Sequence, residues 1–589
     1  MSAWAPRLAV ALAVIAILAA PAFVPPFTVT LLNYVGVYAL AAIGLVLLTG
    51  IGGLVSFGQA AFVGLGAYAT AWATVVEGQS PWLGLLLAIL VTCGVAAALG
   101  AVTLRLQGHF LSLSTIAWGL AIGFCFGNID VLGNYNGLSG IPPIVVGSLA
   151  LARSDQIYYL IWLIVIVALV VVYNLLDSRV GRAMRSLRGG NLLVESLGVD
   201  PFRLRLTTFV IAAFLAALSG WLQAHLGRFV SPSPFDVGMG IEYLMMAMIG
   251  GVASPLGGLF GAGVISVLKN EIQDWLPLIA KGASGPLEVV AFSTLFILFL
   301  QYAREGVAPF LAARLAKPPS RAPAPAPPLP RREQPARGAP LLEVRAAERR
   351  FCGLVAVNQL SFQVAAGEIV GLIGPNGAGK STMFNLLTGA VGLTSGTIVF
   401  NGRETSAQRP FRIARAGVAR TFQHVKLRPR MSVLENVLLG AYGRLSAGAL
   451  AGALRLDRRE EASARWEAMR QLDRVDLASR AFDPAGTLPL GSQRLVEIAR
   501  ALVADPILLV LDEPAAGLRC PEKLALAEAL RALRAEGLTI LLVEHDMDFV
   551  MNLVDRVVVM DFGVKLCEGP PAAVRDDARV QEAYLGGVL

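Results

Sequence analysis

The chain has 589 residues, of which 55% are hydrophobic and only 15% are charged. This length exceeds a single domain and this composition excludes an ordinary soluble protein, so part of the chain is expected to lie in a membrane. The net charge of +8 is concentrated in residues 314–350, where nine Lys or Arg accompany three Asp or Glu; beside membrane spans such a segment favours anionic lipid over nucleic acid.

Residues 1–305 form a succession of apolar segments, each close to the ~20 residues that a helix needs to cross a ~30 Å hydrocarbon core. We predict an all-α polytopic membrane domain with about ten transmembrane helices. The first span resembles a signal peptide, but the spans behind it favour an uncleaved helix. The predicted spans are 8–24, 28–49, 54–75, 82–104, 109–127, 157–176, 206–227, 239–251, 256–270 and 285–302.

Arginines predict the orientation of these spans. Six of them lie between residues 177 and 205, which places that loop in the cytoplasm. The domain after residue 340 must also be cytoplasmic, so an even number of spans must separate the two. The stretch 239–270 contains helix-breaking residues at 250–258, and we divide it there into two short crossings. A single kinked helix, with one span miscounted elsewhere, is the alternative.

Few polar side chains lie within or at the edges of the spans, where ionisable groups are costly and suggest function. They are Gln59, His225, Glu242 and Glu288. Glycine and alanine dominate several spans, which indicates close helix packing. A path lined by small and apolar side chains would suit a substrate with an apolar body, although packing alone explains the same residues.

From about residue 306 to 340 the sequence is rich in Pro, Ala and Arg. Such a run favours extended polyproline geometry and cannot form a core, so we interpret it as a semi-rigid linker. It would join a membrane domain at 1–305 to a cytosolic domain at 341–589. Short β-branched strands alternate with helices after residue 341, which predicts an α/β fold.

A phosphate-binding loop with the pattern G-x-x-x-x-G-K-S follows the apolar run Ile369–Ile373. Its glycines let successive backbone amides and the next helix N-terminus point at phosphate oxygens. Lys380 would reach the β and γ phosphates of ATP or GTP, and Ser381 would bind Mg²⁺. The loop consists of Gly374, Pro375, Asn376, Gly377, Ala378, Gly379, Lys380, Ser381 and Thr382.

A second nucleotide motif is the apolar strand 508–511 followed by two carboxylates. At the end of a strand, Asp512 would bind the magnesium ion, and Glu513 would orient or deprotonate an attacking water.

Three further motifs make residues 341–589 resemble an ATP-binding cassette (ABC) ATPase. They are Thr421-Phe-Gln423, Leu488-Pro-Leu-Gly-Ser-Gln-Arg494 and Leu542-Val-Glu-His545. The resemblance implies that Phe351 stacks on adenine and that His545 touches the γ-phosphate in catalysis. It also implies that Gln423 contacts the metal and senses the membrane domain.

The signature loop of this family is normally close to Leu-Ser-Gly-Gly-Gln and completes the site of an opposing ATPase. Here Pro489 occupies the serine position, while Gly491 keeps a backbone amide near a helix N-terminus. The missing hydroxyl removes one phosphate contact. The composite site built with this loop is therefore expected to be the weaker of two.

The finer motifs resemble branched-chain amino acid importers, with a LivM-type permease followed by a LivG-type ATPase. The permease motifs include Ser56-Phe-Gly-Gln-Ala-Ala-Phe62 and Glu195-Ser-Leu-Gly-Val199, and the ATPase motifs include Asp512-Glu-Pro-Ala-Ala-Gly-Leu518. The resemblance implies a type II importer-like fusion in the bacterial inner membrane that uses ATP and Mg²⁺. It also implies docking of the loop 178–201 on the ATPase; a loop that contacts only lipid is the alternative.

The implied partners are a LivH-like permease, a LivF-like ATPase, a periplasmic substrate-binding protein and membrane lipid, with an amino acid as substrate and no nucleic acid. A homodimer would supply the same number of domains. Other readings are an exporter, which the many short spans disfavour, and a regulatory or sensing ABC protein without transport. The same mechanism could also carry urea, amides or aromatic acids.

Overall fold

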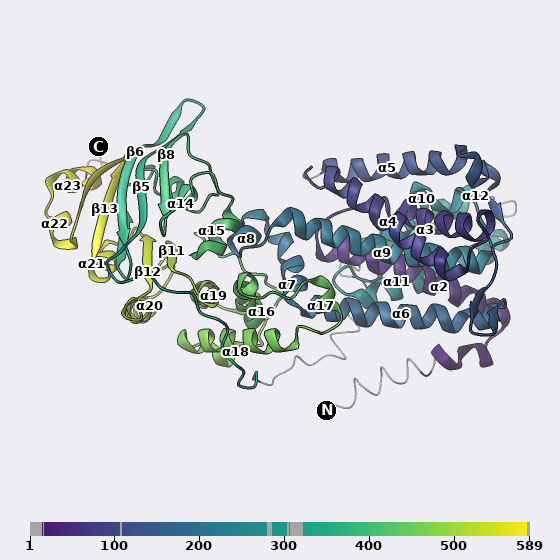
Figure 1. Cartoon of the computed structure of the whole chain (residues 1–589). Coiled ribbons are helices and arrows are strands. Elements are labelled where there is room, and N and C mark those ends of the chain that lie inside the picture. The colour runs from purple at the N-terminus through teal and green to yellow at the C-terminus, as the bar shows by residue number, and fades with distance from the viewer. Residues whose placement is uncertain are drawn as a thin grey trace. The chain divides into compact units, whose positions relative to one another are not determined.

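The computed structural model describes residues 15, 17–106, 109–279, 285–302, 306 and 322–585 (Figure 1). The chain divides into two compact units. The helical unit comprises Met1–Asp177 and Phe202–Pro318, and the α/β unit comprises Ser178–Pro201 and Pro319–Leu589. The segment Ser178–Pro201, which lies inside the predicted membrane domain by sequence, therefore folds with the α/β unit.

Long apolar helices build the helical unit, and two of them continue into short π-helical ends. Their high content of Leu, Ile, Val and Ala leaves few polar groups apart from the backbone, whose hydrogen bonds a helix satisfies internally. They are α2 (Pro26–Leu45), α3 (Gln59–Ala71), α4 (Pro81–Thr103), α5 (His109–Asn128), α6 (Ser154–Asp177), α9 (Pro201–Gly227), α10 (Val237–Gly250), α11 (Pro255–Ile279) and α12 (Gly285–Tyr302).

Within the described residues, six helices are long and apolar enough to cross a membrane, or up to seven if the bent pair α10 and α11 is one span. The six correspond to the predicted spans from 28–49 to 206–227. The predicted span 8–24 lies largely outside the described residues. The total of ten therefore stays a prediction.

The predicted break near residue 250 is present, since α10 and α11 are bent by 116° at a four-residue break. Glycines make this bend possible. Gly251 has φ +112°, and a Cβ at Gly250 would lie 1.6 Å from the carbonyl oxygen of Gly257. With 14 residues, α10 is about 21 Å long, shorter than the ~30 Å hydrocarbon core.

The polar residues predicted within the spans have structural partners. Gln59 Nε2 donates to the carbonyl of Ala212 at 2.9 Å, and His225 Nδ1 lies 2.8 Å from the carbonyl oxygen of Pro142. Glu242 forms an ion pair with Lys269 at 2.8 Å, which joins the two arms of the bent pair. The side chain of Glu288 lies outside the described residues.

Two sheets form the centre of the α/β unit. The larger has the order β10-β11-β12-β7-β13-β14, with parallel neighbours except for the antiparallel pair β13 and β14. The smaller is antiparallel, with the order β6-β5-β8-β9. The strands are β5 (Pro340–Phe351), β6 (Leu354–Ala365), β7 (Ile369–Ile373), β8 (Ser395–Phe400), β9 (Arg403–Glu404), β10 (Val418–Arg420), β11 (Leu508–Asp512), β12 (Thr539–Val543), β13 (Arg556–Asp561) and β14 (Val564–Gly569).

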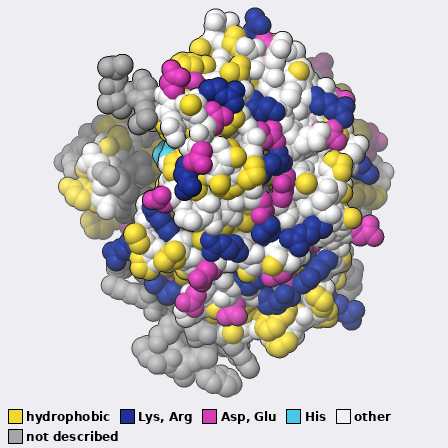
Figure 2. Space-filling model, turned by 90° about the vertical axis from the view of Figure 1, so that its left-hand side faces the viewer, with side chains coloured by type: hydrophobic (Ala, Val, Ile, Leu, Met, Phe, Trp, Pro, Cys, Tyr) yellow, Lys and Arg dark blue, Asp and Glu magenta, His cyan; other side chains and the backbone are white. Residues whose placement is uncertain are grey.

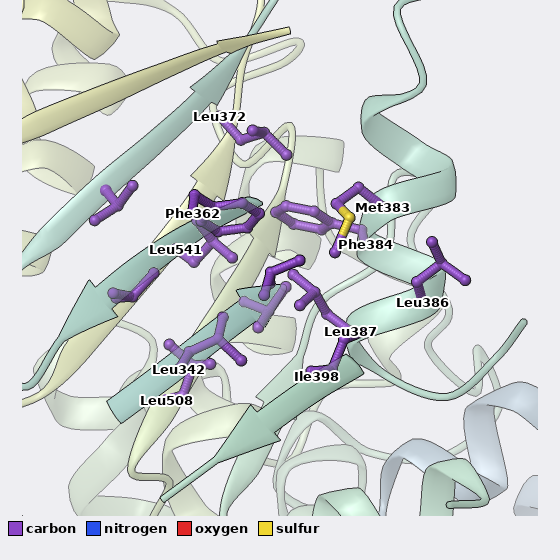
Figure 3. Close-up of a cluster of buried hydrophobic side chains, with 14 of the residues drawn as sticks. Leu342, Phe362, Leu372, Met383, Phe384, Leu386, Leu387, Ile398, Leu508 and Leu541 are labelled. Carbon is purple, nitrogen blue, oxygen red and sulfur yellow. The ribbon is translucent and has the colours of Figure 1, made fainter. Parts of the chain in front are cut away.

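The helix α14 (Lys380–Leu387) packs into a buried apolar cluster between the two sheets (Figure 3). Phe384 of α14 and Phe362 of β6 point toward each other in this cluster. Because α14 begins directly after the phosphate-binding loop, this packing fixes the position of the loop's C-terminal end.

A second group of helices forms its own apolar cluster in the α/β unit. It contains α16 (Val433–Leu438), α18 (Arg458–Arg474) and α19 (Leu490–Val503), which we call the helical layer. The remaining described helices of the unit are α7 (Arg179–Ser186), α8 (Asn191–Ser196), α15 (Pro410–Ala416), α17 (Ala449–Ala453), α20 (Cys520–Ala535), α21 (Met547–Leu553), α22 (Pro571–Arg575) and α23 (Ala578–Leu585).

On the side of the molecule that carries α22 and α23, basic and acidic side chains are interspersed (Figure 2). They do not gather into a patch of one sign on this face. Such a mixed surface is typical of a domain in contact with water.

The C-terminal part of the Pro-rich segment corrects one expectation from the sequence. Leu329 is only 6% exposed and belongs to the apolar cluster of the helical layer. Arg444 donates to the carbonyls of Leu329 and Pro330, and Asp505 accepts the amide of Arg332 at 2.6 Å. The prediction that this run takes no part in a core is therefore wrong from Leu329 onward, because a leucine among the prolines finds an apolar site.

We expect L329A to destabilise the α/β unit by about 2 kcal/mol, because the truncation leaves a cavity in a packed cluster. In a unit of this size that loss corresponds to a melting temperature lower by about 4–8 °C. Thermal unfolding of the full-length protein in detergent measures it. The matched control is L524A, since Leu524 is 67% exposed. Equal melting temperatures would show that Leu329 contributes no packing energy.

Candidate functional site

The phosphate-binding loop has a backbone conformation that only glycine tolerates at two positions. Gly374 has φ +155°, and a Cβ there would lie 2.0 Å from the carbonyl oxygen of Met560. Gly379 has φ +95°, and its Cβ would lie 2.2 Å from the carbonyl oxygen of Ala356. Any side chain at these positions would displace neighbouring backbone. The sequence motif is thus explained by the close approach of β13 and β6 to the loop.

Lys380 is buried and curls back over the loop. Its Nζ donates to the carbonyls of Gly374 at 2.7 Å and Pro375 at 2.9 Å. Burial lowers the pKa of the ammonium group, and the charge of Glu513 opposes that shift. The lysine therefore stabilises the curled loop and brings a positive charge to its centre. Ser381 follows at the exposed start of α14.

Strand register brings three motifs to one edge of the larger sheet. Val543 of β12 pairs with Leu372 of β7 on one side and with Asp512 of β11 on the other. Because these strands are parallel, their carboxyl ends lie at the same level. The phosphate-binding loop, the pair Asp512 and Glu513, and His545 therefore all emerge at this edge.

Asp512 is 4% exposed and is held by a cation that the sequence did not assign to the site. Nη2 of Arg420 donates to Asp512 Oδ2 at 3.2 Å, and Nη1 of the same arginine donates to Asn385 Oδ1 and Thr388 Oγ1. Burial raises the pKa of Asp512, and the charge of Arg420 opposes that shift.

The other carboxylate oxygen of Asp512, Oδ1, is buried and has no hydrogen-bond partner. A buried anionic oxygen without a donor is costly unless a cation or water binds it. Hard divalent cations such as Mg²⁺ prefer carboxylate and hydroxyl oxygens. The donor set of Asp512 and the Ser381 hydroxyl thus fits the expected Mg²⁺.

Glu513 is the point at which the catalytic candidates meet. Its Oε1 accepts a hydrogen bond from Gln423 Nε2 at 3.1 Å and lies 3.1 Å from His545 Nε2. Its backbone has φ +48°, an unfavourable conformation for a residue with a side chain. The structure thus brings together all three residues that the sequence proposed as catalytic.

Two other predicted residues lie elsewhere on the α/β unit. Phe351 ends β5, is 40% exposed and stacks with Arg349, whose guanidinium carbon lies 4.5 Å from the ring centre. Gly491 lies in the first turn of α19 beside Leu518 and Glu522. A flat exposed ring suits a nucleobase, and a helix start suits an anion.

Sequence reasoning missed three supports of this site. Arg420 pairs with Asp512, and Arg494 of α19 donates to the backbone carbonyls of Glu513 and Gln423. Glu544 is buried, accepts the amide of Ala515 at 2.5 Å, and has its pKa raised by burial. Their partners lie on other elements, so only the partial motif around Arg420 carried any local signal.

Three family models match the chain. The description "Branched-chain amino acid transport system / permease component" belongs to the model that matches residues 27–301. A model described as "ABC transporter" matches residues 357–516. A model described as "Branched-chain amino acid ATP-binding cassette transporter" matches residues 564–588.

Individual relatives align with the α/β unit. The high-affinity branched-chain amino acid transport ATP-binding protein LivG of Salmonella typhimurium is 45% identical over 250 residues, which are 42% of this chain and 98% of LivG. The corresponding protein BraF of Pseudomonas aeruginosa is 44% identical with the same coverage. A solved nucleotide-free ATP-binding cassette from an ABC transporter is 31% identical, covers 42% of this chain and 98% of its own, and has a TM-score of 0.38.

The nucleotide loop, the acidic strand end and the apolar helical unit in one chain define an ABC transporter subunit that carries its own ATP-binding domain. This domain binds and hydrolyses ATP, as ATP-binding cassettes do. The chain belongs to the branched-chain amino acid ABC transporter family, in which it fuses a permease with a LivG-type ATPase.

We expect E513Q to lower the rate of ATP hydrolysis by about 10²–10⁴-fold, because an amide cannot accept a proton from water. ATP affinity should remain, since Glu513 is not part of the phosphate-binding loop. Phosphate release and nucleotide binding by the lipid-reconstituted protein measure the two effects. The control E528Q changes an exposed carboxylate of α20. Hydrolysis by E513Q at the control rate would mean that another group activates the water.

Proposed function

We propose that this chain is the permease–ATPase subunit of a binding-protein-dependent importer that carries branched-chain amino acids across the bacterial inner membrane. The printed descriptions of the matching permease model and of the LivG relatives support this substrate class. The mechanical half of the proposal rests on one observation, which is the fold of the segment Ser178–Pro201. This segment lies between two apolar helices, yet it packs as part of the ATPase.

Arg182 of α7 makes the strongest contact of this segment. Its side chain is 1% exposed, and its two terminal nitrogens donate to the two carboxylate oxygens of Glu461 at 2.9 and 2.8 Å. A bidentate pair fixes both distance and angle, so it transmits motion better than a single contact. Glu461 belongs to α18, so the pair connects this segment to the helical layer.

Two further arginines surround this pair. Arg179 donates to the carbonyls of Tyr442, Ser446 and Ala447, and its guanidinium lies 4.8 Å from the Tyr442 ring centre. Arg185 pairs with Glu435 of α16 at 2.9 Å. Although burial opposes it, the charge of Arg185 and hydrogen bonds from Ser432 lower the pKa of Glu435. Three arginines of α7 therefore bind three separate parts of the helical layer and its loops.

A second end of the segment binds the ATPase at another element. Arg415 of α15 donates from Nε to the carbonyl of Gly198 at 2.7 Å. This contact reaches an element that precedes β10 and therefore the Gln423 loop. We propose that the segment 178–201 carries the closure of the ATPase to the permease through these two contacts.

At the nucleotide site, the amides of residues 374–382 and the Lys380 ammonium would hold the phosphates, and the Phe351 ring would hold the base. Ser381, Asp512 and Gln423 would hold Mg²⁺, which when bound neutralises phosphate charge. Glu513 would accept a proton from the attacking water while His545 orients the γ-phosphate. Gly491 would serve the opposing ATPase, with a weaker contact because Pro489 lacks a hydroxyl.

The family implies partner subunits and a substrate-binding protein in general. We propose a LivH-like permease, a LivF-like ATPase and a periplasmic binding protein as the specific partners. A homodimer of this chain is the alternative arrangement. Co-purification with a single tag distinguishes the two by subunit composition.

We expect the cognate binding protein to bind leucine, isoleucine or valine and to stimulate ATP-dependent uptake of the same amino acid. Isothermal calorimetry of that protein, followed by uptake into proteoliposomes, measures both steps. Binding and uptake of urea, an amide or an aromatic acid would keep the mechanism but replace the substrate. ATP hydrolysis without uptake of any tested solute would contradict transport.

We expect R182E to reduce substrate uptake per ATP hydrolysed by about tenfold or more, because it places two carboxylates together at a buried contact. R185E, which opposes Glu435, should act in the same direction. The double variant R182E/E461R should regain part of the coupling, since it restores a pair of opposite charges. Parallel assays of uptake and phosphate release in proteoliposomes give the ratio.

The control R153E reverses an exposed arginine of the helical unit, whose side chain is 75% exposed and pairs with Asp155. Equal coupling ratios for R182E and R153E would refute the role of the segment 178–201. Failure of the double variant to recover, with a normal melting temperature, would remove the specific role of the Arg182 and Glu461 pair.

A further inference from the structure

Arg494 lies in the first turn of α19 and binds the backbone of two catalytic candidates at once. Its Nη1 donates to the carbonyl of Glu513 at 2.7 Å, and its Nη2 donates to the carbonyl of Gln423 at 3.2 Å. A guanidinium is planar and its donors have fixed directions, so two simultaneous acceptors determine its orientation. The spacing between the backbone of Glu513 and that of Gln423 is therefore set by one side chain.

The same face of α19 continues this grip along the loop that carries Gln423. Glu497 accepts the amide of Lys426 at 2.8 Å, and Arg500 donates to the carbonyl of Lys426 at 2.8 Å. Residues 494, 497 and 500 are spaced by three, which places them on one side of a helix. Glu497 and Arg500 also form a buried ion pair at 2.8 Å. A displacement of α19 thus moves the loop with it.

Glu513 has a backbone conformation that needs external support. Its φ of +48° is unfavourable for a residue with a side chain, so its neighbours must hold it there. Its amide donates to the carbonyl of Val543 at 2.9 Å, which ties one side of the residue to β12. The hydrogen bond from Arg494 ties the other side to α19. The direction of the Glu513 carboxylate therefore depends on both the sheet and the helical layer.

We propose that Arg494 is a positioning residue that couples the N-terminus of α19 to the orientation of Glu513 and Gln423. Gly491 lies three residues earlier in the same first turn. The inference rests on the proposed function, in which that turn engages the nucleotide of the opposing ATPase. Engagement of α19 at one ATP site then orients the water-activating carboxylate of the other site through Arg494, so the two sites of a dimer communicate.

The test is the steady-state ATPase kinetics of R494K in the lipid-reconstituted transporter. Lysine keeps the charge but is not a planar fork that can hold two carbonyls at fixed directions. We expect kcat to fall about tenfold or more and KM for ATP to change by less than about twofold, because Arg494 acts on the reacting geometry and not on the phosphate-binding loop. The Hill coefficient for ATP should fall toward one.

The chain offers a matched control in Arg444. This arginine also donates to backbone carbonyls, those of Val503, Leu329 and Pro330, but it touches no residue of the nucleotide site in the structure as described. R444K reports the effect of losing an arginine fork in the same unit. Kinetics of R494K that match those of R444K, or a raised KM with unchanged kcat, would overturn the proposal.

A second variant covers the case in which R494K does not fold. In R494A, millimolar guanidinium should restore part of kcat but not in E513Q, because the added cation can occupy the same fork position. Lack of rescue in a folded R494A protein would overturn the proposal. Normal hydrolysis by E513Q would instead show that the proposed role of Glu513 has failed, which separates the two conclusions.

Discussion

The nucleotide site depends on one carboxylate oxygen, Oε1 of Glu513, toward which two side chains from separate loops converge. Gln423 reaches it from the loop after β10, and His545 reaches it from the end of β12. They can meet only because parallel strands end at one edge of the sheet. The strained backbone at Glu513 shows that this meeting is held by its surroundings and is not a relaxed local conformation.

The segment 178–201 extends this dependence toward the permease. Its arginines are largely desolvated, and a desolvated arginine requires partners of matching geometry. Arg182 and Glu461 satisfy that requirement with two parallel hydrogen bonds. As a result, a piece of the permease sequence has become part of the fold of the ATPase, and the boundary between the units falls at residues 177/178 and 201/202. A change in the helical layer must therefore act on this segment.

The linker shows how fusion can alter a domain that is otherwise similar to a separate subunit. The LivG relatives cover 250 residues of this chain, whereas packing against the helical layer already begins at Leu329. Arg444 and Asp505 then hold the backbone that follows it. The ATPase of this chain thus includes part of the segment whose composition suggested a spacer only.

The sequence by itself determined the features that depend on neighbours along the chain. The phosphate-binding loop, the apolar helices and the break near Gly251 follow from glycine conformation and the length of apolar runs, which are local properties. Only the tertiary structure decided which of many arginines pairs with Asp512, which one holds Glu513, and that Leu329 is buried. Those contacts join residues far apart in sequence, and the choice among chemically equivalent partners is made by packing and strand register, which composition and spacing do not encode.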